Sequence, residues 1–202
     1  MLDRTQQISA ASWKAERDIM SADADPDRAR RFRDAALPHL DDVYTLARYL
    51  MRNQADAEDA VQECYLRALR HFDNYRGPEI KPWLLAILRN VCKTEFARQS
   101  ERPVAIERSD DHAPFEPPAW QEAQSSPEVE LLRRHDAETI RRLIAALPPQ
   151  FREAIVLRDI NNLSYRQIAE VADLPVGTVM SRLARARSML RAAWNAEEEP
   201  KP

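Results

Sequence analysis

Glycine is almost absent from this sequence, with only 2 glycines among 202 residues. Phosphate-binding loops, dinucleotide-binding folds and sheet-rich architectures depend on glycine for turns with positive φ, so its scarcity argues against all three. Histidine and cysteine are also rare. The 4 histidines are scattered without the spacing of metal ligands, and the 2 cysteines are too few for a disulfide framework. The sequence therefore predicts neither a cofactor nor a metal site.

Long hydrophobic segments are missing too. The longest aliphatic run, Leu84–Leu88, is far shorter than the roughly 20 residues that a membrane-spanning helix needs. The first residues lack the basic and then apolar pattern of a secretory signal. We therefore expect a cytoplasmic protein without membrane insertion. Cys64 and Cys92 fall on apolar faces of predicted helices, and we expect them to be buried, unreactive thiols.

Alanine, leucine and arginine dominate the composition, which favours an all-α fold. The net charge is only −3, but it is +3 over residues 28–100, −6 over 101–130 and +5 over 131–195. Prolines and polar residues interrupt the helical periodicity between the two basic segments. We predict two small helical domains joined by a flexible acidic linker, and their basic character points to a polyanionic partner. The predicted parts are an N-terminal extension (1–27), a first domain (28–99), the linker (100–127), a second domain (128–195) and an acidic tail (196–202).

The first domain is predicted to contain three helical stretches. Apolar residues recur at three- and four-residue steps over Arg28–Met51, and Pro38 is expected to bend this stretch. A second helix is expected over Asp56–Phe72, with the Asp56 carboxylate as its cap. A third is expected over Pro82–Gln99, because proline suits a first helical position.

The second domain ends in a helix-turn-helix pattern. Ser164 and Gln167 have the spacing of a capping box at the start of a short helix. A turn that contains Gly177 then leads to a longer terminal helix, and this succession is typical of a helix-turn-helix. Helices are expected in this domain over residues 128–146, 148–158, 164–172 and 178–194.

Helical geometry divides the terminal helix into two faces. At about 100° per residue, Val179, Leu183, Ala186 and Leu190 point to the domain core. The opposite side holds hydroxyl groups and arginines, and no acidic residue occurs over residues 175–193, whereas an ordinary solvated face would include acids. Arginine reads guanine through bidentate hydrogen bonds, and serine or threonine contacts bases or phosphates. We therefore predict that this helix reads DNA through Thr178, Ser181, Arg182, Arg185 and Ser188.

Four segments resemble, in the same order, those of bacterial extracytoplasmic-function (ECF) sigma factors of the sigma-70 superfamily. Residues 56–63 are similar to the polymerase-binding segment, and residues 81–90 to the helix that opens DNA. Residues 147–153 and 176–187 are similar to the promoter-reading domain. The resemblance implies a dissociable subunit, without catalysis of its own, that lets RNA polymerase core find and open promoters of stress- or envelope-responsive genes.

The resemblance also assigns roles to residues of both domains. Asp59, Gln62 and Glu63 would dock on a coiled coil of the largest catalytic subunit of polymerase, although compensation of the helix dipole is an alternative role for Asp59. Arg166 would contact a phosphate at the −35 element, which the terminal helix would read. For Trp83, a place in the core is as consistent with the sequence as a place on DNA. The residues expected to bind the −10 element are Asn74, Tyr75, Arg76, Trp83, Arg89, Asn90 and Lys93.

Two other classes of protein were weighed against this one. A stand-alone helix-turn-helix regulator would need a ligand cavity, a phosphoacceptor or a dimer seam in its first domain, and the sequence offers none. An enzyme is disfavoured because no nucleophile, base and orienting group can be assembled. The acid pairs Asp41–Asp42 and Asp110–Asp111 fall on a predicted solvated helix face and in the linker. Because the sequence shows no sensing domain, we also expect an anti-sigma protein to hold the chain inactive.

Overall fold

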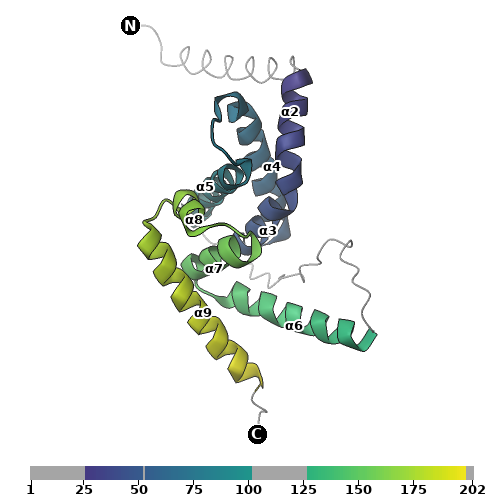
Figure 1. Ribbon diagram of the computed structural model, residues 1–202, viewed down its shortest axis with the longest axis vertical. Helices are drawn as coiled ribbons and strands as arrows, with labels where there is room; N and C mark the ends of the chain where they lie inside the picture. Colours follow the sequence, from purple (N-terminus) through teal and green to yellow (C-terminus); the bar gives the residue numbers. More distant parts are fainter. Residues whose placement is uncertain (1–25, 52, 102–126, 199–202) are drawn as a thin grey trace.

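The structure, a computed structural model, describes residues 26–51, 53–101 and 127–198 (Figure 1). Every regular element in these ranges is a helix, which confirms the predicted fold class. None of the described helices is long and apolar enough to cross a membrane. Within the same ranges, no group of three or more His, Cys, Asp and Glu side chains is arranged to hold a metal ion. Nearly all of the predicted N-terminal extension, most of the linker and the end of the acidic tail lie outside the described residues.

Residues 26–101, here called the N-terminal unit, form the first group of helices. Pro38 lies in a short 3-10 turn that divides the first helical stretch, because proline has no backbone N–H to donate. The interruption predicted at Pro38 is therefore confirmed. The elements of this unit are α2 (Pro26–Ala36), η1 (Leu37–His39), α3 (Leu40–Leu50), α4 (Gln54–His71), η2 (Phe72–Asn74) and α5 (Ile80–Glu101).

The start of α4 differs from the predicted one. Asn53, not Asp56, is the N-cap: its side-chain oxygen accepts a hydrogen bond from the Asp56 backbone N–H at 2.8 Å. The Asn53 amide also donates to the Asp56 carboxylate at 3.1 Å, so both side chains hold the first turn. Asp59 consequently lies in the second turn, where the helix dipole no longer accounts for its charge.

Residues 127–198, here called the C-terminal unit, contain the helix-turn-helix. The capping box is confirmed, since Ser164 and Gln167 each accept a hydrogen bond from the other's backbone N–H. The turn was predicted wrongly: Asp173, with φ 53°, adopts the left-handed conformation, and Gly177 lies in the first turn of a helix that begins at Val176. The elements are α6 (Pro127–Ala146), α7 (Pro149–Ile155), the π-helical turn η3 (Val156–Ile160), α8 (Tyr165–Ala172) and α9 (Val176–Glu198).

The two units share one apolar core. Buried side chains of α2 to α5 form a single cluster with those of α7 to α9. In Figure 1, α8 lies beside α5 and α7 lies beneath α3, and these pairs are in contact. Cys64 and Cys92 are buried and unpaired, as predicted. Burial raises the pKa of each thiol to about 12, so almost no thiolate is present at neutral pH.

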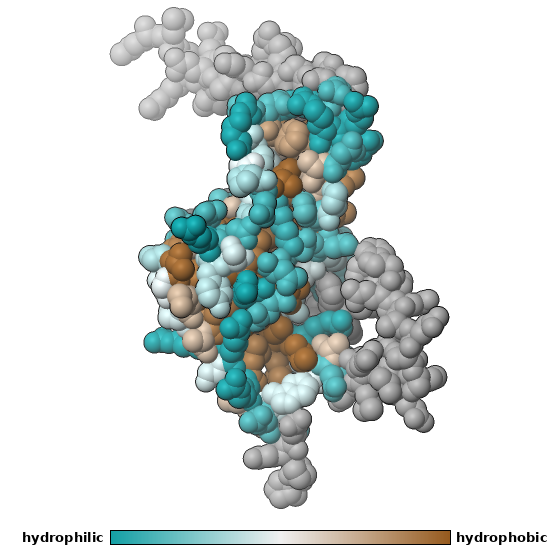
Figure 2. All heavy atoms as spheres, viewed as in Figure 1, coloured by the Kyte–Doolittle hydropathy of each residue, from teal (hydrophilic) through white to brown (hydrophobic). Residues whose placement is uncertain are grey.

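Apolar atoms also gather at the surface of the C-terminal unit, in the lower half of Figure 2. Ile140 of α6 is 45% exposed and Met189 of α9 is 39% exposed. The two helices are joined by an ion pair between Arg142 and Glu197, with 2.6 Å between their charged atoms. This pair of helices therefore presents apolar surface that the described part of the chain leaves uncovered.

Candidate nucleic-acid interface

The outward face of α9 carries the groups that the sequence predicted. The helix buries Val179, Leu183 and Ala186 against the rest of the unit, which turns the opposite face to solvent. Arg185 is exposed there and makes no hydrogen bond or ion pair with any described residue. The remaining predicted residues of this face are the exposed Ser181 and Ser188 and the half-buried Thr178, whose carbonyl accepts a hydrogen bond from Ser181.

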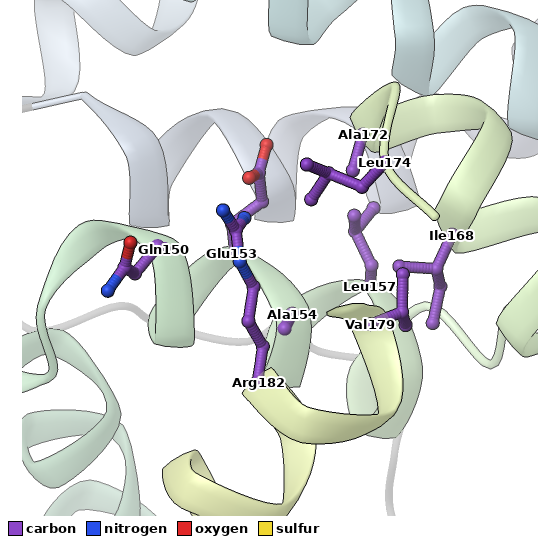
Figure 3. Close-up of a pocket in the computed structure, with 9 residues that line it drawn as sticks. All are labelled: Gln150, Glu153, Ala154, Leu157, Ile168, Ala172, Leu174, Val179 and Arg182. Atoms are coloured by element: carbon purple, nitrogen blue, oxygen red, sulfur yellow. The ribbon is translucent and has the colours of Figure 1, made fainter. Parts of the chain in front are cut away.

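Arg182 is placed differently from Arg185. It is half-buried, and with Glu153 of α7 it lines a cavity of about 10 Å³, which has room for about one water molecule. Figure 3 shows its guanidinium extending from α9 toward the Glu153 carboxylate. The charge of Arg182 therefore faces an acid of its own unit, whereas the charge of Arg185 faces solvent.

At the start of α8, two neighbouring residues have different surroundings. Tyr165 is half-buried and packs against the core, and the Arg158 guanidinium lies 5.0 Å from its ring centroid. Arg166 is exposed at the next position. Because the first helix of a helix-turn-helix crosses the DNA backbone, Arg166 is placed for phosphate contact and Tyr165 for packing.

Tyr75 and Trp83, expected to offer stacking surfaces to bases, stack on each other. Their ring centroids are 4.7 Å apart and their planes are inclined by 28°. The Tyr75 hydroxyl donates to the Glu79 carbonyl, which fixes the ring. A Cβ at Gly77 would lie only 2.7 Å from Cζ of this ring, so the missing side chain of Gly77 makes room for the stack. The two facing surfaces of this pair are not open to a base.

The loop before α5 also holds two exposed polar residues from the predicted set, Asn74 and Arg76. The Arg76 guanidinium donates to the carbonyls of Asp73 and Tyr75, the latter at 2.9 Å, and so closes the loop on itself. Asn74 ends η2 and leaves its side chain at the surface. Both residues are accessible to a DNA strand that passes this loop.

The structure separates three residues of α5 that were predicted to share a polar face. Asn90 and Lys93 are exposed, but Arg89 is only 7% exposed. Arg89 lies one turn after the fully buried Leu85 and so belongs to the side of α5 that faces the core. Its guanidinium forms an ion pair with Glu153 of the C-terminal unit.

The three residues predicted to bind polymerase lie on the surface of α4. Asp59 and Gln62 are exposed, and Glu63 is half-buried and pairs at 2.6 Å with the arginine one turn later. Asp59 and Glu63 line a groove of about 480 Å³. Sequence reasoning missed Asp56 and Glu95 as members of this acidic groove, because it forms only where α5 packs against α4.

Two further residues were not foreseen in their present roles. Asp42, predicted on a solvated face, is half-buried and accepts a hydrogen bond from Asn161 and an ion pair from Lys81 at 2.8 Å. Met180 of α9 is 53% exposed on the predicted reading helix, next to the hydroxyl of Ser181. An exposed thioether suits contact with a thymine methyl group, and its offset from the buried stripe was already visible in the sequence.

Comparison with known families agrees with this division into two units. Residues 36–102 match the model "Sigma-70 region 2", and residues 137–190 match "Sigma-70, region 4". The first range lies almost wholly in the N-terminal unit, and the second lies in the C-terminal unit and includes all of α7 and α8. The region 4 match therefore includes the predicted helix-turn-helix.

Curated relatives are similar over most of the chain. It is 36% identical to the ECF RNA polymerase sigma factor SigE of Mycolicibacterium smegmatis, over 76% of this chain but only 57% of that relative. It is 35% identical to the ECF RNA polymerase sigma-E factor of Haemophilus influenzae, over 72% of this chain and 77% of the relative. The corresponding values for the Escherichia coli sigma-E factor are 36% identity, 67% and 72%.

Solved structures share the fold. The sigma factor RpoE of Bartonella quintana, in complex with the anti-sigma factor NepR, superimposes with a TM-score of 0.65 at 26% identity, over 82% of this chain and 98% of that one. CnrH, in complex with the cytosolic domain of CnrY, gives a TM-score of 0.57 at 22% identity, over 90% and 96%. From the two region matches and the curated relatives, we conclude that the chain belongs to the ECF sigma factors of the sigma-70 family.

Proposed function

We propose that this sigma factor directs RNA polymerase core to promoters through three surfaces: the groove of α4, the exposed residues of α5 and the outward face of α9. The observation that carries the proposal is the open face of α9, where Arg185 is exposed and has no partner among the described residues. The chain would act in the cytoplasm as a binding subunit, with the chemistry left to polymerase. A stand-alone regulator is not favoured, because the N-terminal unit matches region 2.

The groove between α4 and α5 is the proposed docking site for core polymerase. Asp59 and Glu63 line it together with Glu95, and Gln62 lies on the adjoining surface. Asp59 stands in the second turn of α4, so the helix dipole does not explain its presence, but a basic partner does. A coiled coil with basic side chains would complement the charge of this groove.

DNA contact is proposed for both units. In the C-terminal unit, Arg185 would read a base edge of the −35 element and Arg166 would hold a phosphate. In the N-terminal unit, Asn90 and Lys93 project from α5 into solvent, beside the loop that holds Asn74. An amide that pairs with a base edge and an ammonium that pairs with the backbone suit the single strand of an opened −10 element.

A helical anti-sigma protein is the proposed inhibitor. RpoE of Bartonella quintana was solved with the anti-sigma factor NepR, and this chain shares its fold over nearly the full length of that protein. Ile140 and Met189 leave apolar surface uncovered on α6 and α9, which fits an amphipathic helix of a partner. Isolation of the chain from unstressed cells should yield such a partner in stoichiometric amount.

The docking assignment is tested by replacing Asp59, Gln62 and Glu63 together with alanine. We expect the affinity for core polymerase to fall at least about tenfold, which is about 1.4 kcal/mol, while the helix content is unchanged. A matched control replaces three other polar residues of α4, namely Gln54, Glu58 and Arg70, all of which are exposed. Equal affinities of the two triple variants for core would contradict the docking site.

A further inference from the structure

The C-terminal unit covers the face of the N-terminal unit that holds Arg89. α8 packs against α5, and α7 and η3 pack against α3. Arg89 and Glu153 form an ion pair across this contact, with side chains only 9% and 12% exposed. A residue predicted to bind the −10 element is therefore out of reach of DNA in this arrangement.

Hydrogen bonds between the units accompany the ion pair. Each joins side chains or carbonyls that are far apart in the sequence, so they form only when the units are together. They run from Arg152 to the Tyr49 carbonyl (2.9 Å), from Asn161 to the Asp42 carbonyl (3.0 Å) and from Gln167 to the Glu79 carboxylate (2.7 Å).

The same contact contains features that oppose it. Asn161 is only 1% exposed, yet its side-chain oxygen has no hydrogen-bond partner among the described residues. A buried polar atom without a partner destabilises the state that buries it. The Arg89–Glu153 pair gives up its hydration, which offsets much of its attraction, and burial lowers the pKa of Arg152. The contact is therefore specific but suited to opening.

Glu153 stands between two arginines that were both predicted to bind DNA. Arg89 approaches it from α5 as an ion-pair partner. Arg182 extends toward it from α9 and lines the same small cavity (Figure 3). One carboxylate therefore faces a guanidinium of the −10 unit and a guanidinium of the −35 unit.

Building on the proposed function, we propose that the contact between the units is autoinhibitory: Glu153 occupies Arg89 in the free chain, and a promoter phosphate takes its place when the units separate. Carboxylate and phosphate both accept paired hydrogen bonds from a guanidinium, so Arg89 stays charged and paired in both states. The C-terminal unit and promoter DNA compete for one face of α5. No second protein is needed for this inhibition, which separates it from the action of an anti-sigma factor.

The arrangement is tested with the full chain by measuring the distance between spin labels at Leu66→Cys on α4 and Ala192→Cys on α9. Both sites are exposed, whereas Cys64 and Cys92 are buried and escape labelling. We expect one short distance for the otherwise unchanged chain. Glu153→Gln should increase the fraction of longer distances about tenfold, since it removes the charge that pairs with Arg89.

Two more variants complete the set. Asn161→Asp places a second carboxylate beside Asp42 and should also open the contact, independently of Glu153. Asp159→Asn is the matched control, because it removes an exposed ion pair to Arg187 within the C-terminal unit and should leave the distance unchanged. Identical distance distributions for all these chains would overturn the proposal.

The functional readout is the rate of promoter-specific initiation after the chain is mixed with core polymerase and promoter DNA. Glu153→Gln and Asn161→Asp should accelerate initiation about threefold or more, a gain that a misfolded variant cannot produce. If the unchanged chain initiates and neither variant is faster, autoinhibition is wrong and the proposed function stands. If the unchanged chain does not initiate from any promoter, the proposed function itself fails.

Discussion

α5 and α9 are both proposed to read promoter DNA, but their arginines are in opposite situations. Arg185 of α9 is exposed and has no partner among the described residues, whereas Arg89 of α5 is 7% exposed and paired with Glu153. The outward face of α9 has no described helix against it, but α5 is covered by α8. In this chain, the accessibility of a reading residue therefore depends on the other unit as much as on its own helix.

The largest expected difference between the two helices is in the stability of the closed arrangement. Arg89→Ala leaves Glu153 as an unpaired buried carboxylate, a situation that costs about 3–5 kcal/mol while the charge stays buried. The units should therefore separate. Arg185→Ala removes an exposed side chain and should change stability by less than about 0.5 kcal/mol. Hydrogen exchange of the α5 and α8 amides measures this, and equal protection in both variants would break the comparison.

Sequence reading by α9 is expected to show an intermediate effect. Arg185→Ala should cost about 1–3 kcal/mol of promoter affinity and relax the base preference at one position of the −35 element. Arg166→Ala should weaken binding evenly across sequences and reduce the salt slope by about one ion. Affinities of the holoenzyme for promoter variants at several salt concentrations distinguish the two. A loss that is blind to sequence in both variants would contradict the division into base reader and phosphate contact.

The two glycines provide a smaller contrast. No atom lies within 4 Å of a Cβ placed on Gly177, which is in a helical turn, so Gly177→Ala should stabilise the fold by about 0.5–1 kcal/mol. Gly77→Ala would press on the Tyr75 ring and should destabilise by about 1 kcal/mol or more, with loss of the stack on Trp83. Urea denaturation and tryptophan fluorescence report both. Shifts of the same sign would show that one site is misjudged.

The smallest expected effect concerns Cys64 and Cys92, which lie in the core beneath both reading surfaces. Since burial raises the pKa of each thiol from 9.0 to about 12, neither should react with iodoacetamide at neutral pH until the chain unfolds. Above about pH 9 the unfolded state loses these protons before the folded state does, so stability should fall as the pH rises toward 12. Rapid labelling of the native chain at neutral pH would contradict the burial.

What the sequence could predict was governed by local geometry. The capping box of Ser164 and Gln167 involves residues three apart, and the buried stripe of α9 repeats every three or four residues, so both were foreseen. The cap of α4 was misplaced because Asn53 and Asp56 are both competent caps, and only the backbone decides between them. Asp173 took the turn conformation that had been attributed to Gly177.

Long-range contacts left no such signal. Arg89 was grouped with Asn90 and Lys93 by their polarity, but its neighbour is Glu153, 64 positions away in the sequence. Nothing local marks Glu153 as the partner, since an acid on an amphipathic helix ordinarily faces solvent. The contact of Asn161 with Asp42 was hidden for the same reason. The individual helices could thus be predicted, while the contact between the two units could not.

The central claim is that α9 and α5 read separate promoter elements. It is tested most directly by selecting promoters from a randomised library with holoenzyme that carries the unchanged chain, Arg185→Ala or Asn90→Ala. The account predicts that Arg185→Ala relaxes base preference only in the upstream −35 element, and that Asn90→Ala relaxes it only in the −10 element. Relaxation of the same positions by both variants, or of none by either, would contradict it.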